Sequence, residues 1–473
     1  MKNIPLFLLS SLWLILAGAS FSAESIYNVP VPSPHPVYDF LQRMETAGII
    51  DFRANIKPLS RGEIVEYLVE VEAEIDNNPD LLSRRDRKIL QRFLNELQVG
   101  EENPDFKSNW SRLRETVWKD APFYKDGENL LSFQIDGSRF ELNPILYFDV
   151  LSDSTGETIF RMTNGSNLCA GMPVGIGAYF DFRDNTEMGR GPYFKGEREK
   201  ILADTVGYVT MDGDEQLYYD FTRAILSYSA GPVWLNFGRG DHNWGSGKRG
   251  NLMLSHNPPP FDFLSLRLDL GKIARFAYIS GKLHPYPSVP AIQDTSPQGY
   301  IRTIDENKWI SAHRLEIYPL KGVEIGLAEV VIYGQRGLEP AYLNPINLYY
   351  SAEHDLGDMD NVSWEFDIEV SLIRDFLFYG EMFIDDMSVG RLGTDFVGNK
   401  FAFIGGVQYV NPLGLKNIDL LAEYVRIDPF VYTHFHPINT YKNWNASLGH
   451  FLPPNSEQFF IGLKEFDPKP VFD

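Results

Sequence analysis

The sequence predicts a mainly β fold, a large antiparallel outer-membrane β-barrel of about 16–18 strands with a small N-terminal α-helical bundle. Three observations predict it: an export-type N-terminus, a helical period confined to the first hundred residues, and a period of two from about residue 130 onward. Hydrophobic residues make up 44% of the 473 residues, which excludes the intrinsically disordered class because a core can form.

The first 23 residues are expected to be a secretory signal peptide. Lys2 precedes an apolar run over residues 4–16, and small residues follow it up to Ala23. A transmembrane anchor is disfavoured because the run is shorter than the ~20 residues that span a bilayer. The mature chain is therefore expected to be exported, with an outer-membrane location in a Gram-negative-type cell.

Residues 24–128 are predicted to be a helical periplasmic head and a linker. The first helix ends at Gly48, and its apolar stripe comprises Val37, Phe40, Leu41 and Met44. Ser60 and Glu63 form a capping-box signature at the start of the second helix. Ser83 opens the third helix, which Gly100 stops.

Part of this head resembles an S-layer-homology module, a unit that binds cell-wall polymers. The resemblance covers His35, residues 48–50 and residues 58–63. It implies contact with peptidoglycan through the head. The alternative is a helical cap with no such partner.

Residues 129–466 are predicted to form the barrel. In residues 363–372 one face is apolar and the other acidic or hydroxylic, and the apolar face comprises Trp364, Phe366, Ile368, Val370 and Leu372. Such strands run about ten residues, longer than the five or six of a soluble sandwich, which favours a barrel with an apolar face toward lipid. Turns are expected at Asp184-Asn185, residues 212–214 and residues 356–358.

The C-terminal end is expected to hold the last strand and a short tail. Residues 459–466 form the last apolar alternating segment, and residues 467–473 follow it as the tail.

Charge and cysteine content exclude several functions. Lys plus Arg number 43 and Asp plus Glu 64, which gives a net charge of −21 and argues against sequence-independent nucleic-acid binding. The single cysteine, Cys169, excludes a disulfide framework and a Cys-ligated zinc site. The acidic loop over residues 353–360 lacks the spacing of a calcium loop, so no metal and no cofactor are predicted.

The densest motif is Gly-Arg-Gly-Asp-His-Asn-Trp-Gly-Ser-Gly-Lys-Arg-Gly at residues 238–250. It lacks the Gly-Lys-Ser/Thr ending and the following helix of a phosphate-binding loop, so nucleotide binding is rejected. Its glycines permit tight turns beside aromatic and charged side chains, a combination that suits sugar recognition. A barrel loop that folds inward without a ligand is equally compatible with it.

Catalysis is not predicted. Ser255 and His256 are adjacent, so in an extended segment they point to opposite faces and cannot form a nucleophile–base pair. The sequence also contains no Gly-x-Ser-x-Gly elbow.

Several segments together resemble the capsule-assembly Wzi family of outer-membrane barrels. They lie in order along the chain at residues 238–262, 342–345, 379–386, 422–424 and 441–456. Pro453-Pro454 and the ending Phe472-Asp473 depart from the family's closing pattern.

The resemblance implies a monomeric barrel whose loops occlude the lumen. It also implies a non-enzymatic, lectin-like function in attaching or assembling capsular polysaccharide or exopolysaccharide at the cell surface. The implied polysaccharide-binding residues are Arg239, Asp241, His242, Asn243, Trp244, Lys248 and Arg249. The alternatives are a porin-like solute channel, which an open lumen would favour, and an outer-membrane hydrolase.

Overall fold

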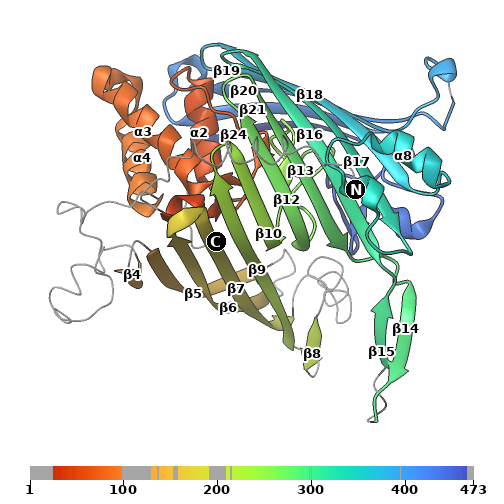
Figure 1. Cartoon of the computed structure of the whole chain (residues 1–473). Helices are drawn as coiled ribbons and strands as arrows, with labels where there is room; N and C mark the ends of the chain where they lie inside the picture. The colour runs from red at the N-terminus through yellow and green to blue at the C-terminus, as the bar shows by residue number, and fades with distance from the viewer. Residues whose placement is uncertain are drawn as a thin grey trace, which may run out of the picture.

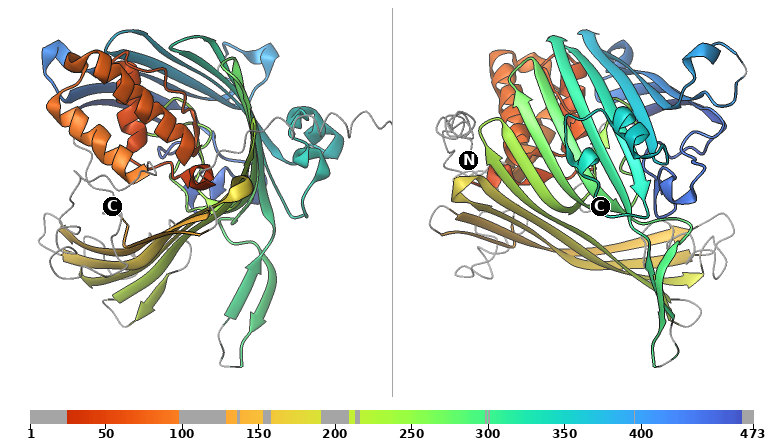
Figure 2. Two further views of the ribbon diagram at one scale, coloured as in Figure 1. Left: turned by 60° about the vertical axis from the view of Figure 1, so that its left-hand side comes forward. Right: turned by 45° about the vertical axis from the view of Figure 1, so that its right-hand side comes forward.

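The computed structural model describes residues 25–97, 129–135, 138–152, 158–190, 209–212, 216–297, 299, 301–394 and 396–465. One long, strongly curved antiparallel sheet wraps around the N-terminal helices (Figures 1 and 2). The expected signal peptide, the linker after residue 97 and the C-terminal tail lie outside the described residues.

The sheet contains 16 strands, and each strand along its path pairs with the next. In order along the path these are β4 (Leu131–Ile135), β5 (Ser138–Ser152), β6 (Thr158–Met172), β7 (Ile176–Arg190), β9 (Gln216–Ala230), β10 (Val233–Gly240), β12 (Phe261–Leu270), β13 (Ala274–Leu283), β16 (Lys308–Leu320), β17 (Val323–Gly334), β18 (Asn361–Ile373), β19 (Phe376–Asp386), β20 (Lys400–Val410), β21 (Ile418–Ile427) and β24 (Ser456–Glu465). The short β8 (Thr210–Asp212) pairs with β9 alone. Within the described residues, no ladder joins β4 to β24.

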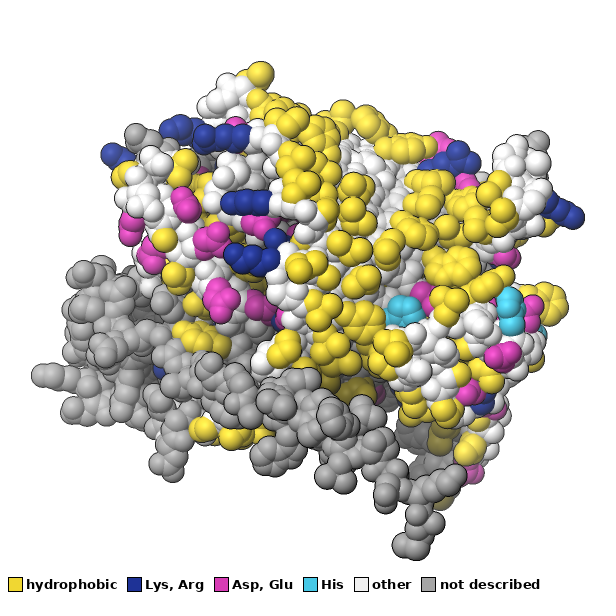
Figure 3. All heavy atoms as spheres, turned by 45° about the horizontal axis from the view of Figure 1, so that its top comes forward, with side chains coloured by type: hydrophobic (Ala, Val, Ile, Leu, Met, Phe, Trp, Pro, Cys, Tyr) yellow, Lys and Arg dark blue, Asp and Glu magenta, His cyan; other side chains and the backbone are white. Residues whose placement is uncertain are grey.

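The side chains of the sheet point in the sense expected for a membrane barrel. On β18, Glu365 is fully buried on the inner face, whereas Phe366 is 42% exposed on the outer face. The inner acids are covered by the head and by loops, and the outer face of the strands is covered by apolar side chains (Figure 3). A soluble sandwich would show the opposite arrangement, so the prediction of a barrel is confirmed.

The two ends of the sheet differ in the length of their connections. At one end, strands are joined by the short turns at residues 231–232, 271–273, 321–322 and 374–375. At the other end, the connections are long and carry β11 (Asn243–Trp244), β14 (Pro290–Thr295), β15 (Ile301–Asp305), α7 (Pro340–Leu343), α8 (Tyr349–Leu356), β22 (Lys442–Asn443) and β23 (Ala446–Ser447). We call these the short-turn end and the long-loop end.

The head consists of α2 (Val37–Thr46), α3 (Arg61–Asn77) and α4 (Arg84–Leu97), with the short strands β1 (Pro30–Val31), β2 (Ile56–Lys57) and β3 (Leu59–Ser60). The three helices and the capping box of Ser60 and Glu63 are confirmed. Their apolar faces form one buried core, which includes Phe40, Leu41, Leu68 and Phe93. The head lies against the concave face of the sheet, at the short-turn end (Figure 2).

Short 3-10 turns complete the described chain. They are η1 (Ser25–Asn28), η2 (Pro79–Leu81), η3 (Pro173–Gly175), η4 (Val389–Arg391), η5 (Pro412–Gly414) and η6 (Pro437–Asn439). No helix in the described part of the chain has both the length and the apolarity needed to cross a membrane.

Two turn predictions need correction. Asp184 and Asn185 do not form a turn but lie inside β7, where the Asn185 amide oxygen accepts a hydrogen bond from the Thr163 hydroxyl at 2.7 Å. Asn185 is buried with polar partners on the inner face and Asp184 is exposed, so residues that favour turns are accommodated in a strand. The turn expected at residues 356–358 is present, but it follows a helix and not a strand, since Gly357, with φ +103°, ends α8. The turn expected at residues 212–214 falls largely outside the described residues.

Candidate functional site

The motif at residues 238–250 leads into a long connection that folds into the lumen. We call residues 241–260 the inner loop. On one side it is joined to the head: β11 pairs with β2, and the Gly245 N–H donates to the Asn55 carbonyl at 2.9 Å. The Trp244 N–H donates to the Leu254 carbonyl at 2.9 Å, which closes the loop on itself.

On the other side, the inner loop is joined to the far wall through Glu381 of β19. The Glu381 carboxylate accepts from the Gly247 N–H at 2.5 Å and from the Leu252 N–H at 2.7 Å. A Cβ on Gly247 would lie 2.3 Å from the Gly250 carbonyl oxygen, so this turn requires glycine. The glycines therefore serve a tight turn around a wall carboxylate.

Both aromatic residues of the predicted sugar-binding set are buried. Trp244 is 2% exposed, and His242 packs edge-on against Phe263 with ring centroids 4.3 Å apart. Burial lowers the pKa of His242 to about 3, so its imidazole is neutral at physiological pH. Trp244 belongs to the hydrophobic core of the lumen, and His242 packs against Phe261 of the same core.

The predicted polar residues of the inner loop also have partners within the chain. Lys248 Nζ lies 2.6 Å from the Glu369 carboxylate and donates to the Gln42 amide oxygen at 2.9 Å. Arg249 donates to Gln458 at 2.6 Å and stacks over the Phe460 ring at 3.9 Å. Asn243 accepts from Asn251 at 2.9 Å, and Asp241 forms an ion pair with Arg223 beside a small hollow lined by Pro30, Pro32, Pro58, Tyr179 and Ile225.

Arg239 differs from the other six residues because it lies at the rim of the barrel. It lies one residue before the end of β10, at the long-loop end, is partly exposed, and pairs with Asp262 at 3.1 Å. Lys282 lies opposite Asp262 on the next strand and is exposed. Two cations and one carboxylate therefore line this part of the rim.

Next to this rim lies a group of aromatic and amide side chains. We call His284, Tyr286, Lys442, Trp444 and Asn445 the mouth cluster. The Trp444 and His284 rings stack with centroids 4.3 Å apart and planes 16° apart, and the Trp444 N–H donates to the His284 carbonyl at 3.1 Å. Lys442 Nζ donates to the Asn445 side-chain oxygen at 2.9 Å and lies 5.8 Å from the centre of the Tyr286 ring.

The mouth cluster combines a neutral aromatic stack with the positive charge of Lys442. Burial, followed by the charges of Arg239 and Lys282, lowers the pKa of His284, so the ring stacked on Trp444 is neutral at physiological pH. Neutral aromatic rings beside lysine, arginine and amide groups can bind a sugar through its C–H face and its hydroxyl or carboxylate groups.

The comparison with family models assigns the chain. Residues 165–468 match the model of the capsule assembly protein Wzi. The chain belongs to the Wzi capsule-assembly family. The expectation from the sequence motifs is therefore confirmed over most of the chain.

Comparison with solved structures agrees on the fold. The chain resembles the structure described as Wzi, an outer-membrane protein involved in group 1 capsule assembly in Escherichia coli and a carbohydrate-binding β-barrel; identity is 14%, the TM-score is 0.52, and the match covers 91% of this chain and 80% of that one. A BenF-like porin from Pseudomonas fluorescens matches with a TM-score of 0.31 at 13% identity, over 64% of this chain and 85% of that one. No curated protein matches.

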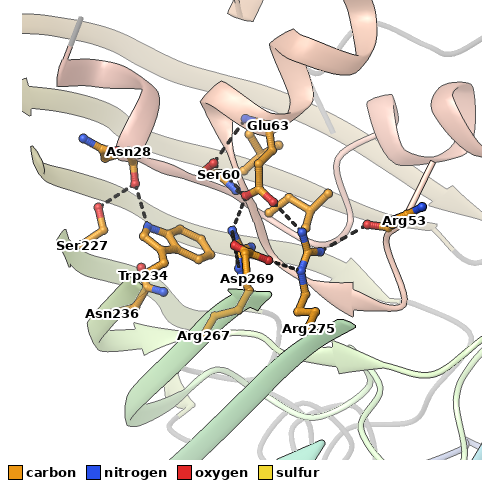
Figure 4. A network of polar contacts seen from close by, with 12 residues as sticks. Asn28, Arg53, Ser60, Glu63, Ser227, Trp234, Asn236, Arg267, Asp269 and Arg275 are labelled. Carbon is orange, nitrogen blue, oxygen red and sulfur yellow. Dashed lines mark hydrogen bonds and ion pairs between the residues drawn. The ribbon is translucent and has the colours of Figure 1, made fainter. Parts of the chain in front are cut away.

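In this Wzi-family chain the head is held to the wall by buried charge pairs (Figure 4). The Glu63 carboxylate accepts from Arg267 of β12 at 2.5 Å and from Arg275 of β13 at 2.9 Å. Opposing the effect of burial, these two guanidinium groups lower the pKa of Glu63 to about 2. Trp234 of β10 donates its indole N–H to the Asn28 carbonyl at 3.3 Å.

Two buried arginines of the head form further ion pairs, each with a carboxylate of the wall. The Arg43 guanidinium is almost fully buried and binds Asp86 of α4 at 2.9 Å and Asp419 of β21 at 3.0 Å. Arg61 pairs in the same way with Glu141 of β5 at 2.7 Å. The head thus contacts the wall on several sides and lies in the short-turn end of the lumen (Figure 2).

Sequence reasoning missed the mouth cluster. Its members come from two connections that lie far apart in the sequence, and no local motif unites them. The one available signal was Trp444 in the turn-forming run Lys-Asn-Trp-Asn at residues 442–445. Among the described residues, no group of three or more His, Cys, Asp or Glu side chains is arranged to hold a metal ion.

Proposed function

We propose that this chain is a non-enzymatic outer-membrane protein that binds surface polysaccharide at its long-loop end, and so attaches or assembles capsular polysaccharide or exopolysaccharide. The observation that carries the proposal is the mouth cluster, where the Trp444–His284 stack lies beside lysine and amide groups at the rim of the barrel. Membership of the Wzi family supports it.

The orientation follows from the connections. Outer-membrane barrels have short periplasmic turns and long extracellular loops. We therefore place the short-turn end and the head in the periplasm, and the mouth cluster at the cell surface. Contact between the head and peptidoglycan stays a prediction, and so does a monomeric state.

The distribution of charge fits an anionic polysaccharide. The net charge of −21 would repel such a ligand over most of the surface. Arg239, Lys282 and Lys442 supply a local cationic rim beside the aromatic stack. This rim gives an acidic glycan one favourable point of approach.

The seven residues predicted from the sequence divide into two roles under this proposal. Arg239 contacts the glycan at the rim. Asp241, His242, Asn243, Trp244, Lys248 and Arg249 hold the inner loop between head and wall, since their side chains are buried or bonded to other parts of the chain. Their direct contact with a glycan stays a prediction, and it would require these partners to be exchanged.

Capsule retention tests the proposal. A deletion strain is complemented with the wild-type chain, with Trp444→Ala or with Phe435→Ala, a matched control that removes a 90% exposed aromatic side chain outside the cluster. We expect Trp444→Ala cells to shed polysaccharide into the medium at a normal rate of synthesis, while the wild type and Phe435→Ala retain it. Full retention by Trp444→Ala would refute the assignment of the site.

Two further measurements separate the alternatives. Binding of the detergent-solubilised chain to a glycan array should depend on Trp444 and Arg239. In planar bilayers, a porin would show steady conductance, whereas we expect the head and the inner loop to occlude the lumen and keep the conductance low.

A further inference from the structure

One long connection lies on the outer side of the barrel. We call residues 335–360 the outer flap; it joins β17 to β18 and contains α7 and α8. The left view of Figure 2 shows the head on the concave side of the wall and the flap's helices on the convex side. The flap therefore occupies a surface that other strands present to lipid.

The flap is docked by specific contacts. Glu329 is on the outer face of β17, two residues after the exposed Leu327. Its carboxylate accepts from the Tyr349 and Tyr350 N–H groups at 2.8 Å, at the start of α8, and from the Trp364 indole at 3.1 Å. Together these bonds fix the first turn of α8 on the wall.

A second anchor lies at the base of the flap. The Asp360 carboxylate accepts from the Tyr342 hydroxyl at 2.6 Å and from Arg336 at 3.0 Å. Tyr342 and Tyr349 are fully buried and pack with Val331 and Tyr333 in a separate small core. The flap is therefore an ordered part of the wall.

The flap also exposes many apolar side chains to its surroundings. Seven large apolar side chains are exposed within this short stretch: Leu338, Leu343, Ile346, Leu348, Tyr350, Leu356 and Met359. Ile346 is 83% exposed. Such a density of exposed apolar groups on a docked segment marks an interaction surface.

This surface continues the lipid-facing belt of the barrel. On β18 the belt runs from Leu372 near the short-turn end to Trp364, a distance of about 27 Å along the strand at ~3.4 Å per residue. A tilt of about 40° reduces this to about 21 Å along the membrane normal, close to the ~25 Å height of a barrel's apolar band. Trp364 therefore marks the outer edge of the band.

The flap meets the belt at this edge. The rings of Tyr350 and Trp364 lie 5.1 Å apart, and tryptophan and tyrosine concentrate where apolar chains meet headgroups. Asp355 and Asp358, both exposed, lie at the end of α8 and supply the polar side that an interfacial segment needs.

We propose that the outer flap is an interfacial membrane anchor, whose exposed apolar side chains insert into the outer leaflet of the bilayer around the barrel. It shields Glu329 and His313, which lie 3.4 Å apart on the outer face, from lipid. It also sets how deep the barrel sits, and therefore how far the long-loop end projects from the membrane.

Site-specific fluorescence in reconstituted vesicles tests the proposal. In a Cys169→Ser background, an environment-sensitive dye is attached to Ile346→Cys, to Phe366→Cys in the belt, or to Ile292→Cys on β14. Ile292 is the matched control, because it is an isoleucine that is 59% exposed on a hairpin that projects from the long-loop end (Figure 1). Quenching by aqueous iodide and by brominated phospholipids is compared.

We expect the Ile346 dye to be several-fold less accessible to iodide than the Ile292 dye, and to be quenched by lipids brominated near the headgroup. The Phe366 dye should respond best to lipids brominated deeper in the chain. Equal iodide quenching at Ile346 and Ile292 would overturn the proposal. Protection at Ile346 without quenching by any brominated lipid would also overturn it and would indicate a second copy of the chain as the occupant.

Discussion

The bond between Glu63 and the two arginines of the wall allows a quantitative prediction. We expect Glu63→Gln to loosen the head, because Arg267 and Arg275 then keep a buried positive charge with Asp269 as their remaining carboxylate partner. The difference between a pKa of about 2 and the ordinary value of 4.5 corresponds to about 3 kcal/mol. This predicts a shift in the docking equilibrium on the order of a hundredfold.

Hydrogen–deuterium exchange of the detergent-solubilised chain measures this shift. Amides in β1 to β3 and in the first turn of α3 should exchange on the order of a hundredfold faster in Glu63→Gln at pH 7, if exchange follows undocking. Glu70→Gln is the control, because Glu70 is an exposed glutamate on the same helix. Amides in β16 to β19 should be unchanged in both variants.

The pH dependence gives a second readout with a defined sign. Because the pKa of Glu63 is lowered in the folded state, its contribution is complete above about pH 4.5 and is lost as the pH falls through about 2. The wild-type head should therefore loosen across that range more steeply than Glu63→Gln. If the amides of the head are equally protected from exchange in Glu63→Gln and in Glu70→Gln at pH 7, the reasoning is refuted.

Three further predictions concern the head, the inner loop and the belt. Arg43→Met leaves Asp86 and Asp419 buried without this cation, so docking of the head should weaken by about 3–5 kcal/mol. Protease should then cleave the head faster. The control is Arg85→Met, which removes a partly exposed ion pair. His242→Phe should fold, because it replaces a buried neutral ring. Since burial lowers the pKa of His242 to about 3, only the wild type loses stability as the pH falls from 6.5 to about 3. The free energy of unfolding of the variant, measured with denaturant, should therefore rise relative to the wild type by about 1.4 kcal/mol for each pH unit in that range. Phe366→Arg should lower folding stability in vesicles by about 2–4 kcal/mol, whereas Ile292→Arg should not change it.

The barrel and the head could be predicted because their signals are local. The alternation over residues 363–372 records which face of β18 meets lipid, and the structure exposes Phe366 and buries Glu365 accordingly. The capping box of Ser60 and Glu63 needs four consecutive residues. The sequence could not show that the same Glu63 carboxylate also binds Arg267, which lies 204 residues away.

The candidate site was harder to predict because the curvature of the sheet brings residues that are distant in the sequence together (Figure 2). The inner loop was recognised as a dense motif, but its Lys248 finds Glu369 and Gln42 on different elements. The positive charges of Lys248 and Arg249, which the motif offered as ligand contacts, are thus bonded to other residues of the chain. Trp444 is marked only by its turn-forming neighbours and His284 by nothing local, and their stacking arises where the ends of the wall's long loops meet.

The inner loop and the charge pairs of the head also determine how the chain can be divided. A cut at residue 128 separates head from wall in the sequence, but it would remove the partners that the head supplies to Arg267, Arg275, Glu141 and Asp419, and would leave β11 without β2. Two segments joined in this way should melt in one cooperative transition. The head is therefore not a module that can be exchanged or removed, and a wall expressed without it should be a poorer folder than the whole chain.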